Sequence, residues 1–237
     1  MWKIVQIFDG EYGCEESDIK TCALTLRDEA GCTVNLTVDD DWLTFAGLAE
    51  GDDFDKEIFD VCDTDGNPLG SLVERSHAHK YGIRHRTAHI WVVREYEGRK
   101  QVLLQKRAMN KDSFPGRFDT SSSGHIQAGD EPLESALREL YEELGISAHE
   151  EDLQYAGYFD VKYEKEFHGK LFKDNEYAFV YCYDLPVDIT QLTLQKEELD
   201  SVEWFDLDEV TAACAVHDQK FCVPGGGLKV IREFLEK

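Results

Sequence analysis

The segment PLESALRELYEEL, residues 132–144, constrains the fold of this chain more than any other stretch. Its apolar residues recur at intervals of three and four, which is typical of one face of an amphipathic helix. Pro132 is tolerated in the first turn of a helix, and Gly145 is typical of a helix end. The sequence therefore predicts a helix over residues 132–144. The apolar stripe consists of Leu133, Ala136, Leu137, Leu140 and Leu144.

Three glutamates of the same segment, Glu139, Glu142 and Glu143, face a different side of this helix. At about 100° per residue they fall within an arc of about 100°. Like charges at these spacings repel one another unless water or a cation neutralises them. Taken alone, the helix therefore predicts either an acidic, solvated face or a site for a hard divalent cation such as Mg²⁺ or Mn²⁺.

Acidic residues dominate the whole chain, which carries 49 acidic and 25 basic side chains and a formal net charge of −24. Such a charge repels nucleic-acid polymers and anionic membrane surfaces on average. A bound divalent cation can still reverse the local field for a small phosphorylated substrate. We therefore expect a small-molecule substrate, without a nucleic-acid or membrane partner.

The seven cysteines are scattered and form no CxxC pair, which is typical of a protein from a reducing compartment. The first residues lack a basic region followed by an apolar region, and no apolar run approaches about 18 residues. From these patterns we expect a cytoplasmic protein.

The composition predicts two unequal units. Residues 1–56 form an acidic block with short β-like runs, so we expect a small strand-rich module, for which partner binding or homodimer formation stays open. Residues 57–237 begin with a hairpin pattern around a turn at residues 65–67. For this second unit the sequence predicts strands at 89–93, 101–105, 154–159 and 177–183, a short helix after EWFDLDEV and a last helix at 227–237.

Residues 124–146 read GHIQAGDEPLESALRELYEELGI and resemble the Nudix box, G-x5-E-x7-R-E-U-x-E-E-x-G-U, in which U is aliphatic. Gly124, Arg138 and Gly145 match, and only the first glutamate differs, being Asp130 here. In the Nudix family this loop-helix-loop packs on an α/β/α sandwich. The resemblance therefore implies an α/β (α+β) fold with a mixed sheet, preceded by the strand-rich module.

The resemblance also implies roles for the motif residues. Arg138 corresponds to the arginine that orients a metal-binding carboxylate by a charge-assisted hydrogen bond. Asp130 is one methylene shorter than the usual glutamate, and we expect it to contact Arg138. Gly124 lets the backbone approach closely before the loop. The implied ligands of Mg²⁺ or Mn²⁺ are Glu139, Glu142 and Glu143.

Outside the box, the pieces HRTAHIWVV, LLQKRAMNKDSFPGRFD and SSSGH resemble the isopentenyl-diphosphate-isomerase-like branch of the family. In true isomerases a cysteine precedes the Gly-His pair that opens the box, and Ser123 stands there instead. A serine is the poorer proton-transfer partner. The isomerases also have a degraded box, whereas REUxEE is complete here. Both differences favour diphosphate hydrolysis. Isomerase-type proton transfer is the alternative, and a non-catalytic ligand-binding module is a second one.

The same branch implies a candidate second metal site, because its histidines and two glutamates bind a metal beside the box. The matching residues are His85, His125, Asp174 and Glu176, with His77 or His79 as a further candidate. His85 and His89 also alternate into a predicted strand, so a role in the core or in hydrogen bonding stays open for them.

The function expected from these features is Mg²⁺-dependent hydrolysis of an organic diphosphate, such as a nucleoside diphosphate derivative, by an activated water. Lys106, Arg107 and Arg117 are candidates for binding the phosphates or for balancing the acidic surface. Besides Arg138 and Glu142 of the box, the candidate catalytic residues are Glu176, Glu197 and Glu198.

Overall fold

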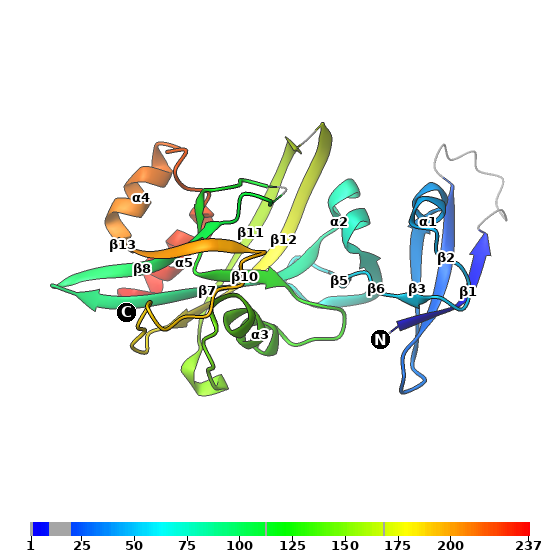
Figure 1. Ribbon diagram of the computed structural model, residues 1–237, viewed down its shortest axis with the longest axis horizontal. Coiled ribbons are helices and arrows are strands. Elements are labelled where there is room, and N and C mark those ends of the chain that lie inside the picture. Colours follow the sequence, from blue (N-terminus) through cyan, green and yellow to red (C-terminus); the bar gives the residue numbers. More distant parts are fainter. Residues whose placement is uncertain (1, 10–19, 112, 168) are drawn as a thin grey trace.

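The computed structural model describes residues 2–9, 20–111, 113–167 and 169–237, which form two β-sheets with flanking helices (Figure 1). The six-stranded sheet has the order β4-β1-β2-β3-β6-β5. Its strands are β1 (Trp2–Asp9), β2 (Thr21–Arg27), β3 (Thr33–Asp39), β4 (Asp53–Phe54), β5 (Ile58–Cys62) and β6 (Pro68–Glu74).

Alternating apolar residues hold this sheet together. Ile4, Leu24 and Leu36 point to the same side and are fully buried, as the period of two in a half-buried strand requires. Strands β5 and β6 pair antiparallel with each other, and β6 joins the rest of the sheet through one parallel pair with β3, Leu36 with Leu72. The expected boundary between residues 56 and 57 therefore falls between two strands of one sheet, and the division into two units stays a prediction.

The seven-stranded sheet has the order β11-β12-β7-β8-β13, with β10 paired to β7 and β9 to β8. Strands β7 and β12 are parallel and their neighbours are antiparallel, which gives the expected mixed sheet. Its strands are β7 (His85–Tyr96), β8 (Arg99–Arg107), β9 (Phe118–Asp119), β10 (Ser122–His125), β11 (Gln154–Phe167), β12 (Lys170–Tyr183) and β13 (Leu199–Asp206).

Helices cover both faces of this sheet. Helix α3 (Pro132–Leu144) has the predicted bounds and packs its apolar stripe on one face, beside Ile90 and Leu103. Helices α4 (Leu207–Ala215) and α5 (Gly225–Leu235) cover the other face. The α/β/α arrangement is confirmed. Among the described residues, no helix is both long and apolar enough to cross a membrane.

Two short helices and a long hairpin were not predicted. Helix α1 (Asp40–Ala46) follows β3, and helix α2 (Arg75–Tyr81) lies between the two sheets (Figure 1). Strands β11 and β12 were expected only at residues 154–159 and 177–183, but they continue as a hairpin that projects beyond the sheet. Helix α2 and this hairpin both contribute to the cavity described next.

Candidate active site

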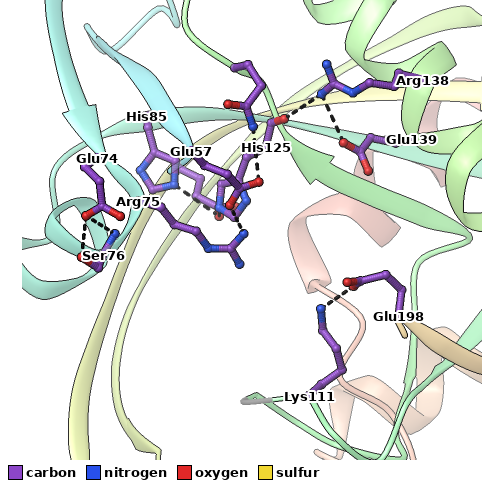
Figure 2. Close-up of polar contacts among 12 residues, drawn as sticks. Glu57, Glu74, Arg75, Ser76, His85, Lys111, His125, Arg138, Glu139 and Glu198 are labelled. Atoms are coloured by element: carbon purple, nitrogen blue, oxygen red, sulfur yellow. Dashed lines mark hydrogen bonds and ion pairs between the residues drawn. The ribbon is translucent and has the colours of Figure 1, made fainter. Parts of the chain in front are cut away.

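A cavity of about 570 Å³ lies between α2, α3, the seven-stranded sheet and the β11–β12 hairpin. Helix α3 contributes Glu139, Glu142 and Glu143 to the lining, which the helical periodicity had placed on one side. Basic side chains from other elements also line the cavity: Lys111 forms an ion pair with Glu198, and Arg75 forms one with Glu57 (Figure 2). Acidic side chains thus predominate, although basic groups also reach the cavity.

The box glycine is explained by a close approach. A Cβ atom on Gly124 would overlap the carboxylate of Glu139, so any other residue would displace this acid. Gly145, at the other end of the box, has φ +71° and ends α3 in the left-handed region. A Cβ there would lie 2.9 Å from Cβ of Thr193.

Arg138 connects the box loop to the helix. Its Nη1 donates a hydrogen bond of 2.8 Å to Oδ2 of Asp130. Its Nη2 donates to the carbonyl oxygen of His125 and to Oε1 of Glu139, both at 3.3 Å. The guanidinium therefore fixes the position of the Glu139 carboxylate, as the motif implies (Figure 2). The shorter Asp130 still reaches the guanidinium.

Glu143 is the most deeply buried acid of the box. The backbone N–H of Ser123 donates to its Oε2 at 3.1 Å, and Nε2 of Gln105 donates to the same oxygen at 3.3 Å. Burial raises the pKa of Glu143 to about 8, and the nearby charge of Glu139 acts in the same direction. A cation beside these acids would relieve both effects.

The box glutamates do not form a tight cluster. Among the described residues, two groups of three side chains lie close enough together to hold one metal ion. Neither group contains Glu139, Glu142 or Glu143. Their wider arc still suits Mg²⁺, which keeps several waters and takes only one or two carboxylates directly.

A tighter cluster lies beside the box and is formed by His79, His85, His125, Asp174 and Glu176. Oε1 of Glu176 lies 3.7 Å from Nε2 of His85 and 3.6 Å from Nε2 of His125. Nδ1 of His79 lies 3.7 Å from Oδ1 of Asp174. The parallel pairing of β7 with β12 places His85 opposite Glu176 and so brings these groups together.

The donor atoms of this cluster are buried and lack hydrogen-bond partners: both ring nitrogens of His79, Nε2 of His85 and of His125, and Oδ1 of Asp174. Nδ1 of His85 donates to the carbonyl oxygen of Ile83 at 2.8 Å, which leaves a lone pair on Nε2. Buried polar atoms are normally paired, so these residues fit a bound cation.

Burial and charge set the protonation of the cluster. Burial lowers the pKa of His79 to about 4 and that of His125 well below its ordinary value, so both rings are neutral. Burial also raises the pKa of Asp174 to about 8, and the neighbouring Glu176 adds to this shift. Burial acts to raise the pKa of Glu176 as well, but the neighbouring ring of His85 outweighs burial and lowers this pKa.

Phe59 of β5 holds the histidines in place. Its ring stacks on His85 at 5.0 Å and on His125 at 4.6 Å between centroids. Strand β5 belongs to the six-stranded sheet, so this sheet supports the cluster directly. The sequence offered no signal for that contact.

Not every residue singled out from the sequence reaches the cavity. Gln105 and Arg107 alternate on β8 and line it, whereas Lys106 points to the other face of the strand, as the period of two requires. Arg117 donates to Gln219 instead. Glu198 lines the cavity, whereas Glu197, Lys106 and Arg117 are outside its described lining.

Two further histidines have separate environments. His77 accepts a hydrogen bond of 2.8 Å from the backbone N–H of Asp39, and its Nδ1 lies 3.0 Å from Glu74. It therefore links α2 to β3 and lies outside the cluster. His89 lines the cavity, and its ring meets Phe159 edge-on at 5.2 Å.

Comparisons with known proteins agree with this arrangement. Residues 83–226 match the family model described as a NUDIX domain. The chain is 38% identical over 156 residues to Nudix hydrolase 3 of Arabidopsis thaliana, in a match that covers 65% of this chain but only 20% of that protein. It is 37% identical over 157 residues to a Nudix hydrolase of Clostridium acetobutylicum, covering 66% of this chain and 73% of the relative.

Among solved structures, DR0079 from Deinococcus radiodurans matches with a TM-score of 0.55 at 16% identity, covering 75% of this chain and 98% of that one. This likeness concerns the fold alone. The family match spans the mixed sheet, the box helix and most of the cavity lining. The chain therefore belongs to the Nudix hydrolase family.

Proposed function

We propose that this Nudix protein hydrolyses an organic diphosphate, such as a nucleoside diphosphate derivative, with Mg²⁺ or Mn²⁺ as cofactor. The observation that supports this most is the complete REUxEE helix facing a cavity that also contains Arg107 and Glu198. The cavity thus offers carboxylates that can bind a metal ion and the guanidinium of Arg107, which can bind phosphate oxygens.

A bound Mg²⁺ would supply charge neutralisation of the phosphoryl oxygens and activation of the attacking water. The side chains of the chain hold the rest of the site in position. Arg138 fixes Glu139, and Ser123 with Gln105 fixes Glu143. Arg107 lies 3.1 Å from Asp119 and can exchange this contact for a substrate phosphate.

Glu198 and Glu142 are the candidate general bases. Both line the cavity, and an ion pair with Lys111 orients Glu198. Glu176 is less suited to this role because it already contacts His85 and His125. A general base must reach the proton that it removes. Glu198 and Glu142 line the same cavity as Glu139 and Glu143, where the metal ion and the attacking water would be held.

The histidine cluster supports a second proposal, a transition-metal site formed by His79, His85, His125, Asp174 and Glu176. This cluster is also the observation that keeps isomerase-type proton transfer as the second candidate function, because the isomerase branch has such a site. Ser123, which replaces the cysteine of the isomerases, argues for hydrolysis. The two reactions differ in products: hydrolysis releases phosphate or a phosphomonoester, whereas isomerisation keeps the diphosphate intact.

The test is a screen with Mg²⁺ over nucleotide sugars, dinucleoside polyphosphates, coenzyme A derivatives and isoprenoid diphosphates, with both phosphate release and isomer formation measured. Glu143→Gln should abolish turnover. Glu134→Gln is the matched control, because Glu134 lies exposed on the same helix. No turnover of any compound by the folded wild type would sink the proposal, and isomerisation without hydrolysis would favour the alternative.

A further inference from the structure

One face of the β11–β12 hairpin carries the acids of the histidine cluster and a group of aromatic residues. The register pairs Tyr163 with Asp174 and Lys165 with Phe172. Directly paired residues and residues two apart share a face of a hairpin. Phe172 therefore follows Asp174 along this face, about 7 Å further toward the hairpin tip.

These aromatic residues meet a ring from another segment. Phe114, in the loop after β8, lies edge-on to Phe167 at 5.3 Å between centroids. Phe172 lies 5.9 Å from Phe167 and 6.4 Å from Tyr163. We call Phe114, Tyr163, Phe167 and Phe172 the aromatic wall. Phe114, Tyr163 and Phe172 line the cavity.

Core packing does not account for the aromatic wall. All of its side chains are partly exposed, and none belongs to the described hydrophobic cores of the two sheets. Phe172 stacks on His79 at 4.3 Å between centroids, and Nζ of Lys165 lies 4.3 Å from the centroid of Phe114, so these rings have contacts outside the wall as well. Phe114 also has φ +50°, a left-handed conformation that is strained for a bulky residue. Such strain clusters at ligand-binding positions, where the surroundings hold it in place.

Polar groups lie beside the aromatic wall. Ser113 precedes Phe114, and its hydroxyl accepts a hydrogen bond of 3.1 Å from Arg107. Asp119 and the Tyr163 side chain also line the cavity. An aliphatic chain would fit a uniformly apolar wall better, whereas ring faces next to hydrogen-bonding groups suit a planar heteroaromatic ring.

We propose that the aromatic wall binds a heteroaromatic ring in the organic half of the substrate, and that Phe114 and Phe172 determine specificity for it. The inference rests on the proposed function for the position of the diphosphate, which would lie at the part of the cavity lined by the box glutamates. The ring then stacks on the aromatic wall, on the same side of the hairpin as Asp174.

The test compares two non-hydrolysable ligands in the presence of Mg²⁺ by calorimetry: α,β-methylene-ADP, which carries a ring, and methylenediphosphonate, which does not. Base stacking on an aromatic side chain corresponds to roughly a tenfold or larger effect on affinity. We expect the wild type to prefer the ring-bearing ligand by at least about tenfold. Phe172→Leu and Phe114→Leu should each reduce this preference toward one.

The matched control is Leu171→Ala, because Leu171 is exposed and points to the opposite face of β12. Phe172→Tyr should keep the preference. Equal affinities of the wild type for the two ligands, no measurable binding of either, or an unchanged preference in both leucine variants would overturn the inference. Turnover in the screen above is measured separately, so hydrolysis without ring preference would reject the aromatic wall and leave the proposed function standing.

Discussion

Asp130 and Arg138 form a hydrogen bond of 2.8 Å across the start of the box helix, although Asp130 is shorter than the glutamate usual at this position. The same guanidinium reaches Glu139. The loop lies close enough to the helix for the shorter side chain of Asp130 to reach Arg138. The single departure from the motif therefore keeps its contact.

Asp130→Ala should lower kcat/KM on the order of tenfold, because partners that orient a metal ligand typically contribute 10- to 100-fold. Its effect on the unfolding free energy should stay below about 1 kcal/mol, since both side chains are about one third exposed. Steady-state kinetics and urea unfolding measure the two effects. Asp130→Glu should retain activity, and wild-type kcat/KM in Asp130→Ala would contradict the role assigned to this pair.

Gly124→Ala should reduce activity by about two orders of magnitude or more, because its Cβ would displace the Glu139 carboxylate. Gly225→Ala is the matched control: Gly225 begins α5 at an ordinary φ, and a Cβ there meets no atom within 4 Å. Kinetics with circular dichroism separates loss of the site from loss of the fold. A folded Gly124→Ala variant with full activity would show that Glu139 is not held where the structure places it.

Helix α3 was predicted to the residue because local signals agree there. Pro132 and Gly145 mark its ends, and the leucine stripe gives it one buried face. Helix α2 lacks such signals: RSHAHKY has no apolar stripe, and the helix depends on the Glu74 cap and on the contact of His77 with Asp39. Contacts that form only in the folded chain are invisible to local periodicity.

The same distinction separates the two parts of the site. The box glutamates converge through helical spacing alone, so the sequence predicts their common side. His85 and Glu176 are far apart in the sequence and meet only because β7 and β12 pair in one register. No local pattern sets that register. Resemblance suggested the pair and left His77 or His79 open, whereas the structure places His79 beside His85 and adds the supporting ring of Phe59.

Zn²⁺ should stabilise the chelator-treated protein through the histidine cluster, because imidazole ligands suit this ion better than the carboxylates of the box do. At a concentration of about 100 times Kd the gain in unfolding free energy is about 2.7 kcal/mol. Thermal unfolding with and without Zn²⁺ measures it. His85→Ala should remove the shift, whereas Glu142→Gln and His217→Asn, at an exposed histidine, should retain it. An equal shift in His85→Ala would place the bound Zn²⁺ elsewhere.

Glu74 should make the stability of the protein depend on acid pH. Burial acts to raise the pKa of Glu74, but hydrogen bonds from His77 and Ser76 outweigh it and lower this pKa below its ordinary 4.5. The folded state therefore binds this proton less readily than the unfolded chain. The stabilisation is complete above pH 4.5 and is lost as the pH falls through the folded-state pKa.

Glu74→Gln should cost about 1–2 kcal/mol of unfolding free energy at pH 7, since it weakens a helix cap and a buried hydrogen bond. Urea unfolding from pH 7 down to about pH 3 should show this difference shrinking, because protonation of the wild type produces the same loss. Glu203→Gln, at an exposed position on β13, serves as the control and should match the wild type throughout. A difference between Glu74→Gln and the wild type that stays constant with pH would mean that the charge of Glu74 does not stabilise the α2 cap.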